Sequence, residues 1–216
     1  MVLGISGSPR ADSITSQAVK EVLSKIEDDT LFISLSGKKI SGCISCLGCT
    51  EDNICILEDD FQPIAELMVK ADAIVLGVPN YYNVPNALTH SLLERCFSFR
   101  HQSAFLMGDK PMVILSTGYS KDESNDQVLK IVEQFALKNN MYVVSKFLVN
   151  AYSQCFTCDF GRTCVDGNIV KLYGVVDEVT PDMLPLKFQQ QEDSIIKCHN
   201  AATRLNDYHQ RVFEQR

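Results

Sequence analysis

The chain of 216 residues is long enough for a single domain with a full hydrophobic core. Hydrophobic residues make up 45% and charged residues 22% of the sequence, as in an ordinary globular protein. The formal net charge of −7 argues against a nucleic-acid partner, which calls for a basic face. No apolar run approaches the roughly 20 residues of a membrane span, and the first residues lack the pattern of a signal peptide. We therefore expect a cytoplasmic protein that binds neither nucleic acid nor membranes.

The first 35 residues predict a strand, a loop, a helix and a second strand. Residues 1–5 form a short apolar run, helical periodicity begins at Ile14, and the apolar, β-branched run 30–35 predicts the second strand. The loop before the helix carries small hydroxyl side chains and Arg10, so its free N–H groups and the helix dipole suit a phosphate. It matches neither G-x-G-x-x-G nor G-x-x-x-x-G-K-S/T, which disfavours a dinucleotide turn or an ATPase loop. An ordinary capped turn is the alternative.

Residues 36–57 form a long segment that contains four of the nine cysteines. A loop of this length is uncommon inside a compact domain unless it is functional. In a reducing compartment, clustered cysteines indicate metal or redox chemistry rather than a disulfide framework.

Beyond this segment, apolar periodicity predicts alternating helices and buried strands. Helices are expected over residues 61–68, 87–96 and 128–136, and strands over residues 71–78, 111–117 and 141–149. This alternation predicts an α/β protein with a flavodoxin-like, doubly wound sheet of five parallel strands. The loops after the first, third and fourth strands would meet at the carboxyl edge of that sheet, where ligands bind.

We expect one domain, with residues 1–150 as the flavodoxin-like part and residues 36–57 as a cysteine-rich insert after its second strand. Residues 151–216 are expected to extend the same domain. They are irregular up to residue 186, after which periodicity over residues 188–213 predicts a final helix.

Three features mark the ends of the predicted strands. They are Ser6-Gly7-Ser8-Pro9-Arg10 after the first, the cysteine-rich insert after the second, and Pro79-x-Tyr81 after the third. Together they resemble the iron–sulfur flavoproteins, which belong to the wider flavodoxin-like NAD(P)H-dependent FMN reductases. The resemblance covers roughly residues 1–150.

This resemblance implies that FMN binds non-covalently at the strand ends. Three groups of positions match the family's phosphate turn, the loop that covers the flavin ring, and the segment on the other edge of the ring. In that order they are Ser8, Arg10, Ser13, Thr15 and Ser16; Pro79, Asn80, Tyr81, Tyr82 and Asn83; and Ser116, Thr117, Gly118 and Tyr119.

The spacing of Cys43, Cys46, Cys49 and Cys55 matches the compact [4Fe-4S] motif of the same family. Thiolates three residues apart on a curved loop can bind different corners of one cubane, and the outlying cysteine closes the set. Nearby glycines would allow the tight turns, and Ile44, Leu47, Ile54 and Ile56 would shield the cluster. Structural zinc is the main alternative, although it usually takes two separated cysteine pairs. A reactive disulfide pair is a further alternative.

A second group, Cys155, Cys158 and Cys164, lies beyond the matched region. Three thiolates need a fourth ligand, such as Cys198, His199, a carboxylate or a group from another subunit. A second metal site and a cysteine-stapled surface loop both remain open. Cys96 falls on an apolar helix face and is expected in the core.

The resemblance implies an oxidoreductase or electron carrier that uses FMN and a [4Fe-4S] cluster, with NAD(P)H or a ferredoxin-type partner as donor. Because the cofactors perform the chemistry, we expect no catalytic acid–base pair. The family forms homodimers and homotetramers, which we expect here too. One alternative is an NAD(P)H-dependent FMN or quinone reductase without a cluster. Another is a non-enzymatic module that senses metal or redox state.

Overall fold

The computed structural model describes residues 1–119 and 123–214, with side chains described up to residue 208. Its centre is a parallel sheet of five strands in the order β2-β1-β3-β5-β6, with a short sixth strand, β4, paired antiparallel to β3. The strands are β1 (Val2–Ser6), β2 (Thr30–Ser34), β3 (Ala73–Tyr81), β4 (Val84–Pro85), β5 (Pro111–Gly118) and β6 (Tyr142–Asn150). The five parallel strands confirm the flavodoxin-like, doubly wound prediction.

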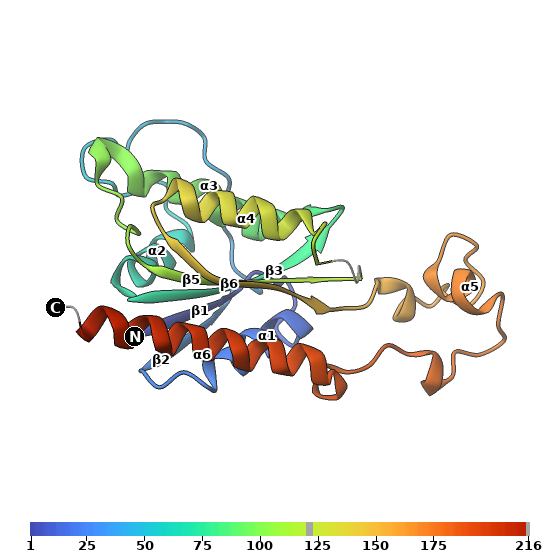
Figure 1. The fold of residues 1–216 in the computed structure, drawn as a ribbon. Coiled ribbons are helices and arrows are strands. Elements are labelled where there is room, and N and C mark those ends of the chain that lie inside the picture. The colour runs from blue at the N-terminus through green and yellow to red at the C-terminus, as the bar shows by residue number, and fades with distance from the viewer. Residues whose placement is uncertain (120–122, 215–216) are drawn as a thin grey trace.

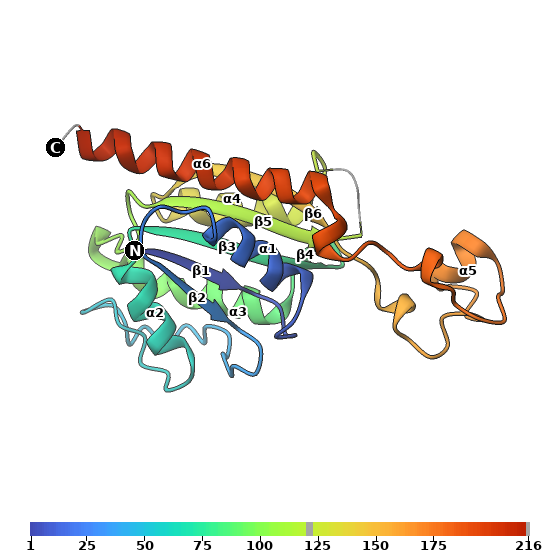
Figure 2. The same cartoon turned by 90° about the horizontal axis from the view of Figure 1, so that it is seen from below.

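Helices cover both faces of the sheet (Figure 1). The longer helices are α1 (Ile14–Leu23), α2 (Phe61–Lys70), α3 (Ala87–Arg95), α4 (Gln127–Lys138) and α6 (Glu192–Glu214), and α3 continues into the 3-10 segment η1 (Cys96–Ser103). Figures 1 and 2 show α1 and α6 on one face and α2, α3 and α4 on the other. No helix in the described part of the chain is both long enough and apolar enough to span a membrane.

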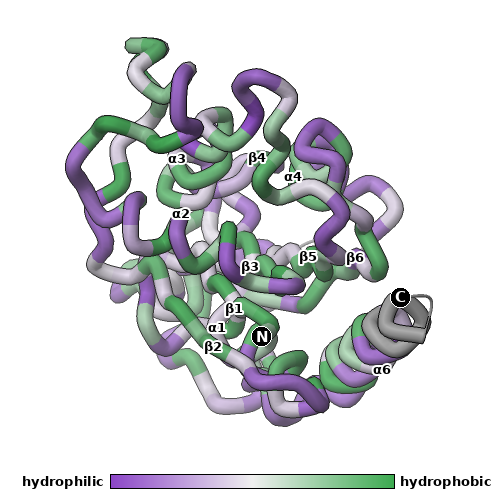
Figure 3. The backbone as a smooth tube through the Cα atoms, turned by 90° about the vertical axis from the view of Figure 1, so that its left-hand side faces the viewer, coloured by the Kyte–Doolittle hydropathy of each residue, from purple (hydrophilic) through white to green (hydrophobic). Residues whose placement is uncertain are grey.

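The strands divide their side chains between two hydrophobic cores because successive residues of a strand point to opposite faces. In β3, Ile74 and Leu76 pack in the core under α2, α3 and α4, whereas Val75 packs in the core under α1 and α6. Both faces of the sheet are buried at β3 and β5, so the sequences of these two strands are mostly continuous apolar runs. Figure 3 shows these strands between the two helix layers.

Glycines bring α1 close to the sheet. A Cβ atom on Gly4 would lie 2.5 Å from Leu23 Cδ1, and one on Gly77 would lie 2.6 Å from Val19 Cγ2. Because both positions lack a side chain, α1 packs directly on β1 and β3. At Gly77 the same close approach reaches Thr15, near the N-terminus of α1, where the predicted ligand site lies.

The region after β3 differs from the predicted open loop. β3 continues to Tyr81 and turns through Tyr82 and Asn83 into β4. Both turn residues have positive φ, 55° and 63°, which is the conformation of a two-residue type I′ hairpin. The expectation of a loop missed this hairpin because its turn contains no glycine, although asparagine tolerates positive φ.

Residues 151–187 form a lobe that projects from the carboxyl edge of the sheet, as Figures 1 and 2 show. It contains the short helix α5 (Asn168–Tyr173) and the 3-10 turns η2 (Gln154–Phe156) and η3 (Pro181–Met183), and η4 (Phe188–Gln190) follows it. Ile169 is its one buried apolar side chain, while large apolar side chains are exposed at Phe160, Val165, Leu172, Tyr173, Val175, Leu184 and Leu186. The lobe therefore has almost no core of its own.

Candidate functional site

A pocket of about 400 Å³ opens at the carboxyl ends of β1, β3, β5 and β6. It contains most of the residues predicted to bind FMN, namely Ser8, Arg10, Ser13, Thr15, Pro79, Asn80, Tyr81, Tyr82, Thr117, Gly118 and Tyr119. Segments far apart in the sequence thus meet at the sheet edge that the strand order predicts.

One end of the pocket is the N-terminus of α1. The Ser13 side chain caps the helix by accepting the Ser16 N–H at 3.1 Å. Helix geometry leaves the N–H groups of Ile14 and Thr15 without an intrahelical acceptor, and both residues line the pocket. The Thr15 hydroxyl lies 2.7 Å from that of Thr117, which joins the helix start to the end of β5. This arrangement of N–H and hydroxyl groups suits an anion.

The turn after β1 is fixed by hydrogen bonds to β3 and to the residue that precedes α3. Gly7 N–H donates to Gly77 O at 2.8 Å, and Asn86 Nδ2 donates to Gly7 O at 2.9 Å. A Cβ atom on Gly7 would lie 1.9 Å from Thr89 Oγ1, so no other residue fits here without displacing α3.

Exposed aromatic rings surround the other side of the pocket. Tyr81, Tyr82 and Tyr119 are all largely exposed, and Tyr82 is fully so. Across the opening, the Arg10 guanidinium lies 6.0 Å from the centre of the Tyr152 ring. A planar aromatic ligand would find flat partners on this side.

Three of the predicted residues do not line the pocket. The Ser16 hydroxyl bonds to Ser6 and Ser13, and Ser116 donates to Asp126 at 3.0 Å. Side chains alternate along a strand, so Ser116 points to the opposite face from Thr117. Asn83 sits in the hairpin turn, where its N–H donates to Asn80 Oδ1 at 2.9 Å.

Five lining residues were not predicted: Ile14 at the start of α1, and the consecutive residues Ala151, Tyr152, Ser153 and Gln154. The last four follow directly on β6 and therefore reach the same edge as the other loops. The end of the predicted fifth strand could have identified them by the rule used for the first, third and fourth strands.

A second, smaller pocket of about 40 Å³ lies in the insert. All four predicted ligands, Cys43, Cys46, Cys49 and Cys55, line it. His101 Nε2 lies 3.2 Å from Cys49 Sγ. Burial, together with the neighbouring cysteines, raises the pKa of the Cys49 thiol.

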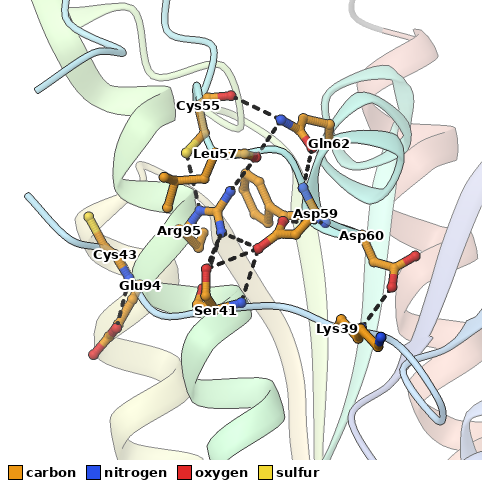
Figure 4. Close-up of polar contacts among 11 residues, drawn as sticks. Lys39, Ser41, Cys43, Cys55, Leu57, Asp59, Asp60, Gln62, Glu94 and Arg95 are labelled. Atoms are coloured by element: carbon orange, nitrogen blue, oxygen red, sulfur yellow. Dashed lines mark hydrogen bonds and ion pairs between the residues drawn. The ribbon is translucent and has the colours of Figure 1, made fainter. Parts of the chain in front are cut away.

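Arg95, at the end of α3, organises the base of this pocket (Figure 4). Its Nε donates to Cys55 Sγ at 3.1 Å, and its Nη1 forms an ion pair with Asp59 at 2.7 Å. Burial opposes the charge on Arg95, but the bonds to Asp59 and Cys55 outweigh it and raise the pKa of the guanidinium above its usual range. Burial also opposes ionisation of Asp59, yet bonds from Arg95, Ser41 and Phe61 lower the pKa of that carboxyl to about 2.

The insert has an unusual backbone and an apolar rim. Ser45, Leu47 and Asn53 adopt positive φ, and a Cβ atom on Gly48 would lie 2.4 Å from Ile56 Cδ1, so a side chain there would have to displace the exposed Ile56 side chain. Ile44, Leu47 and Ile56, which were expected to shield the cluster, line the cysteine pocket, whereas Ile54 does not. All four side chains are more than half exposed. Across residues 1–119 and 123–214, no three His, Cys, Asp or Glu side chains come together as the ligands of one metal ion.

The remaining cysteines are of two kinds: Cys155, Cys158 and Cys164 lie in the projecting lobe as free thiols, partly or fully exposed, whereas Cys96 and Cys198 are buried. Cys96 is buried in the core as predicted. Cys198 is also buried and bonds to Ala18 O, and His199 Nε2 lies 2.6 Å from Glu21 Oε1. Both face α1, so neither is a fourth ligand for the cysteines of the projecting lobe.

Comparison with known proteins identifies the chain. The family model for NADPH-dependent FMN reductase matches residues 1–154. An iron–sulfur flavoprotein of Methanocaldococcus jannaschii is 34% identical over 146 residues, which cover 66% of this chain and 75% of that protein. An iron–sulfur flavoprotein of Methanosarcina thermophila is 28% identical over 148 residues, covering 66% and 76%.

Solved structures support the same fold at low identity. Azoreductase AzrA superposes with a TM-score of 0.57 at 12% identity, covering 95% of this chain and 99% of that one. An NADH:FMN oxidoreductase gives 0.57 at 15% identity, covering 95% and 87%. The chain therefore belongs to the NAD(P)H-dependent FMN reductase family and, within it, to the iron–sulfur flavoproteins, which makes it a flavin-dependent oxidoreductase that binds FMN.

Proposed function

We propose that the protein passes electrons between a reduced donor, NAD(P)H or a ferredoxin, and an acceptor through FMN and a [4Fe-4S] cluster. The observation that carries the proposal is the presence of two pockets in one chain. One lies at the strand ends and contains the residues that match the family's FMN site, and the other is lined by all four cysteines of the insert.

The strand-end pocket fits FMN. Ser8, Thr15 and Thr117 are polar and at least nine-tenths buried there, and hydroxyl and N–H donors of this kind suit a phosphate group. Tyr81 and Tyr82 offer apolar surfaces to an isoalloxazine ring. Bound FMN supplies hydride and single-electron chemistry. The protein's own residues would orient the ring, neutralise the phosphate through Arg10, and exclude water on the side of the hairpin.

The insert fits an iron–sulfur cluster by the chemistry of its donors. Four thiols line one pocket, with apolar side chains and no carboxylate among the lining residues. A single zinc ion would need the thiolates to converge on one atom, whereas a cubane takes one cysteine at each iron. The names of the related iron–sulfur flavoproteins support the same assignment.

We further propose that the protein works as a homodimer or homotetramer. Exposed apolar side chains gather around the cysteine pocket at Ile44, Leu47, Ile56 and Phe97. Exposed patches of this kind mark interaction sites, and a second copy of the chain is the expected occupant.

The deciding experiment is a visible spectrum of protein purified without oxygen, with iron and sulfide assays on the same sample. Flavin bands above a broad shoulder that bleaches with dithionite, at about four irons per chain, would support the proposal. Reduction rates with NADH, NADPH and reduced ferredoxin would then identify the donor. Flavin without iron and sulfide would contradict the cluster.

A second candidate is an NAD(P)H-dependent FMN or quinone reductase without a cluster. Its support is that the family model that matches residues 1–154 is that of NADPH-dependent FMN reductase, a description that includes no cluster. Steady turnover of a quinone by an iron-free, FMN-loaded preparation, at the rate of the iron-containing protein, would favour it.

A further inference from the structure

We infer that Arg95 is a positioning residue for the iron–sulfur cluster, holding the Cys55 thiolate and both ends of the cysteine insert through one buried guanidinium. This inference rests on the proposed cluster, and it assigns a role to a residue outside the cysteine motif.

Arg95 is an unusual residue for its place in the fold. It is 1% exposed, and a buried charge is costly unless it is paired and hydrogen-bonded. Here every nitrogen of the guanidinium has a partner. Nε donates to Cys55 Sγ, Nη1 to Asp59 and Ser41, and Nη2 to Leu57 O at 3.1 Å. The guanidinium also lies 4.7 Å from the centre of the Phe61 ring.

These partners come from the two ends of the insert, as Figure 4 shows. Ser41 precedes the first cysteine of the motif, and Leu57 and Asp59 follow the last one. Asp59 also joins the two ends of the insert directly, because it accepts a hydrogen bond from the Ser41 N–H at 3.0 Å. The insert between them has no helix or strand, so its order depends on such side-chain contacts. The flat guanidinium fork can hold several acceptors at fixed angles, which a lysine cannot do.

The contact with sulfur gives Arg95 an effect on redox behaviour as well as on folding. Hydrogen bonds to cysteine sulfur are one of the means by which a protein sets the reduction potential of a cluster. Adding an electron makes the cluster more negative, so a nearby cation and an N–H donor favour the reduced form. Cys43 and Cys46 are exposed, whereas Cys55 receives this donor from a buried cation. Arg95 should therefore make reduction easier.

The test compares wild-type protein, purified without oxygen, with Arg95→Gln, Arg95→Lys and a control. The control is Ser41→Ala, which removes a hydroxyl bonded to Arg95 and Asp59 but no group that contacts sulfur. Iron and FMN are quantified first, and the cluster midpoint potential is then measured by redox titration with electron paramagnetic resonance. We expect Arg95→Gln to disfavour reduction about tenfold, a shift of about −59 mV for a one-electron couple. Iron loss to a chelator should also be several-fold faster.

Arg95→Lys should shift the potential in the same direction by less, because it keeps the charge and loses the fork. If Arg95→Gln does not fold, Arg95→Lys is compared with the wild type instead, and Ser41→Ala should keep the wild-type midpoint potential. The positioning role would be overturned if Arg95→Lys kept the wild-type midpoint potential and iron retention. It would also be overturned if the Arg95 variants had the same potential and iron retention as Ser41→Ala. Wild-type protein without iron and sulfide would instead contradict the proposed cluster itself, so the two failures are distinguishable.

Discussion

Replacing Asp59 with asparagine should destabilise the protein by about 2 kcal/mol or more at neutral pH. The pKa of Asp59 is lowered from 3.8 to about 2, and each pKa unit corresponds to about 1.4 kcal/mol. The carboxyl is mostly buried, so solvent screens this contribution little. The variant also leaves Arg95 as a buried cation without its counter-ion, and losing one partner of a buried pair costs about 3–5 kcal/mol in other proteins. An asparagine oxygen can still accept one bond, which favours the lower part of this range.

The pH dependence gives a second signature. A carboxyl whose pKa is lower in the folded protein stabilises the fold above the unfolded value of 3.8, and this contribution disappears as the pH falls toward 2. Wild-type protein should therefore lose more stability than Asp59→Asn between about pH 5 and pH 2. Urea unfolding at matched FMN and iron content measures both effects.

The neighbouring Asp60 provides the matched control. It bonds to the Lys39 N–H and to Lys38 but is more exposed, and it has no buried cation to neutralise. Asp60→Asn should cost less than Asp59→Asn. Equal costs for the two variants, or equal acid sensitivity of Asp59→Asn and wild type, would refute the claim that the ion pair with Arg95 stabilises the insert.

Three further outcomes follow from the structure. Gly7→Ala places a methyl group 1.9 Å from Thr89 Oγ1, so it should lower the unfolding free energy by about 1–3 kcal/mol and abolish FMN binding, as measured by urea unfolding and flavin fluorescence. Thr117→Val removes the hydroxyl that meets the start of α1, and FMN titration of apoprotein should show affinity reduced about 2- to 10-fold with little change in stability. Burial raises the pKa of the Cys96 thiol and raises that of Cys198 to about 12, so mass spectrometry after native iodoacetamide treatment at pH 8 should find both unmodified. Labelling of either thiol would contradict the described core.

The sheet could be predicted from the sequence because the burial of a strand determines the pattern of its apolar residues. Strands covered on both faces must be apolar throughout, and β3 and β5 show such runs. The order of loops along the chain then fixes which of them meet at the carboxyl edge, so the pocket around Thr15 and Thr117 was also predictable. Ser116, also predicted to bind FMN, does not line this pocket, because a strand residue next to Thr117 faces the opposite side of the sheet.

The contacts of Arg95 could not be predicted in the same way. Its partners lie in a segment without regular periodicity, far earlier in the chain, and an arginine at the end of a helix is usually explained by the helix dipole. The exposure of the apolar side chains in the insert could not be predicted for a related reason. Their composition suggests burial, but a loop without a repeat does not indicate which of its side chains face solvent.

The projecting lobe has a consequence for how this enzyme can diversify. Tyr152, Ser153 and Gln154 belong to it and form one wall of the strand-end pocket, yet the lobe contributes almost nothing to the hydrophobic cores. Helix α6 returns to the sheet after the lobe and packs on α1 and β6 by itself. Substitutions or insertions in the lobe should therefore change which molecules reach the pocket at little cost to the folding stability of the sheet. The shape of the pocket opening is therefore little constrained by the packing of the sheet.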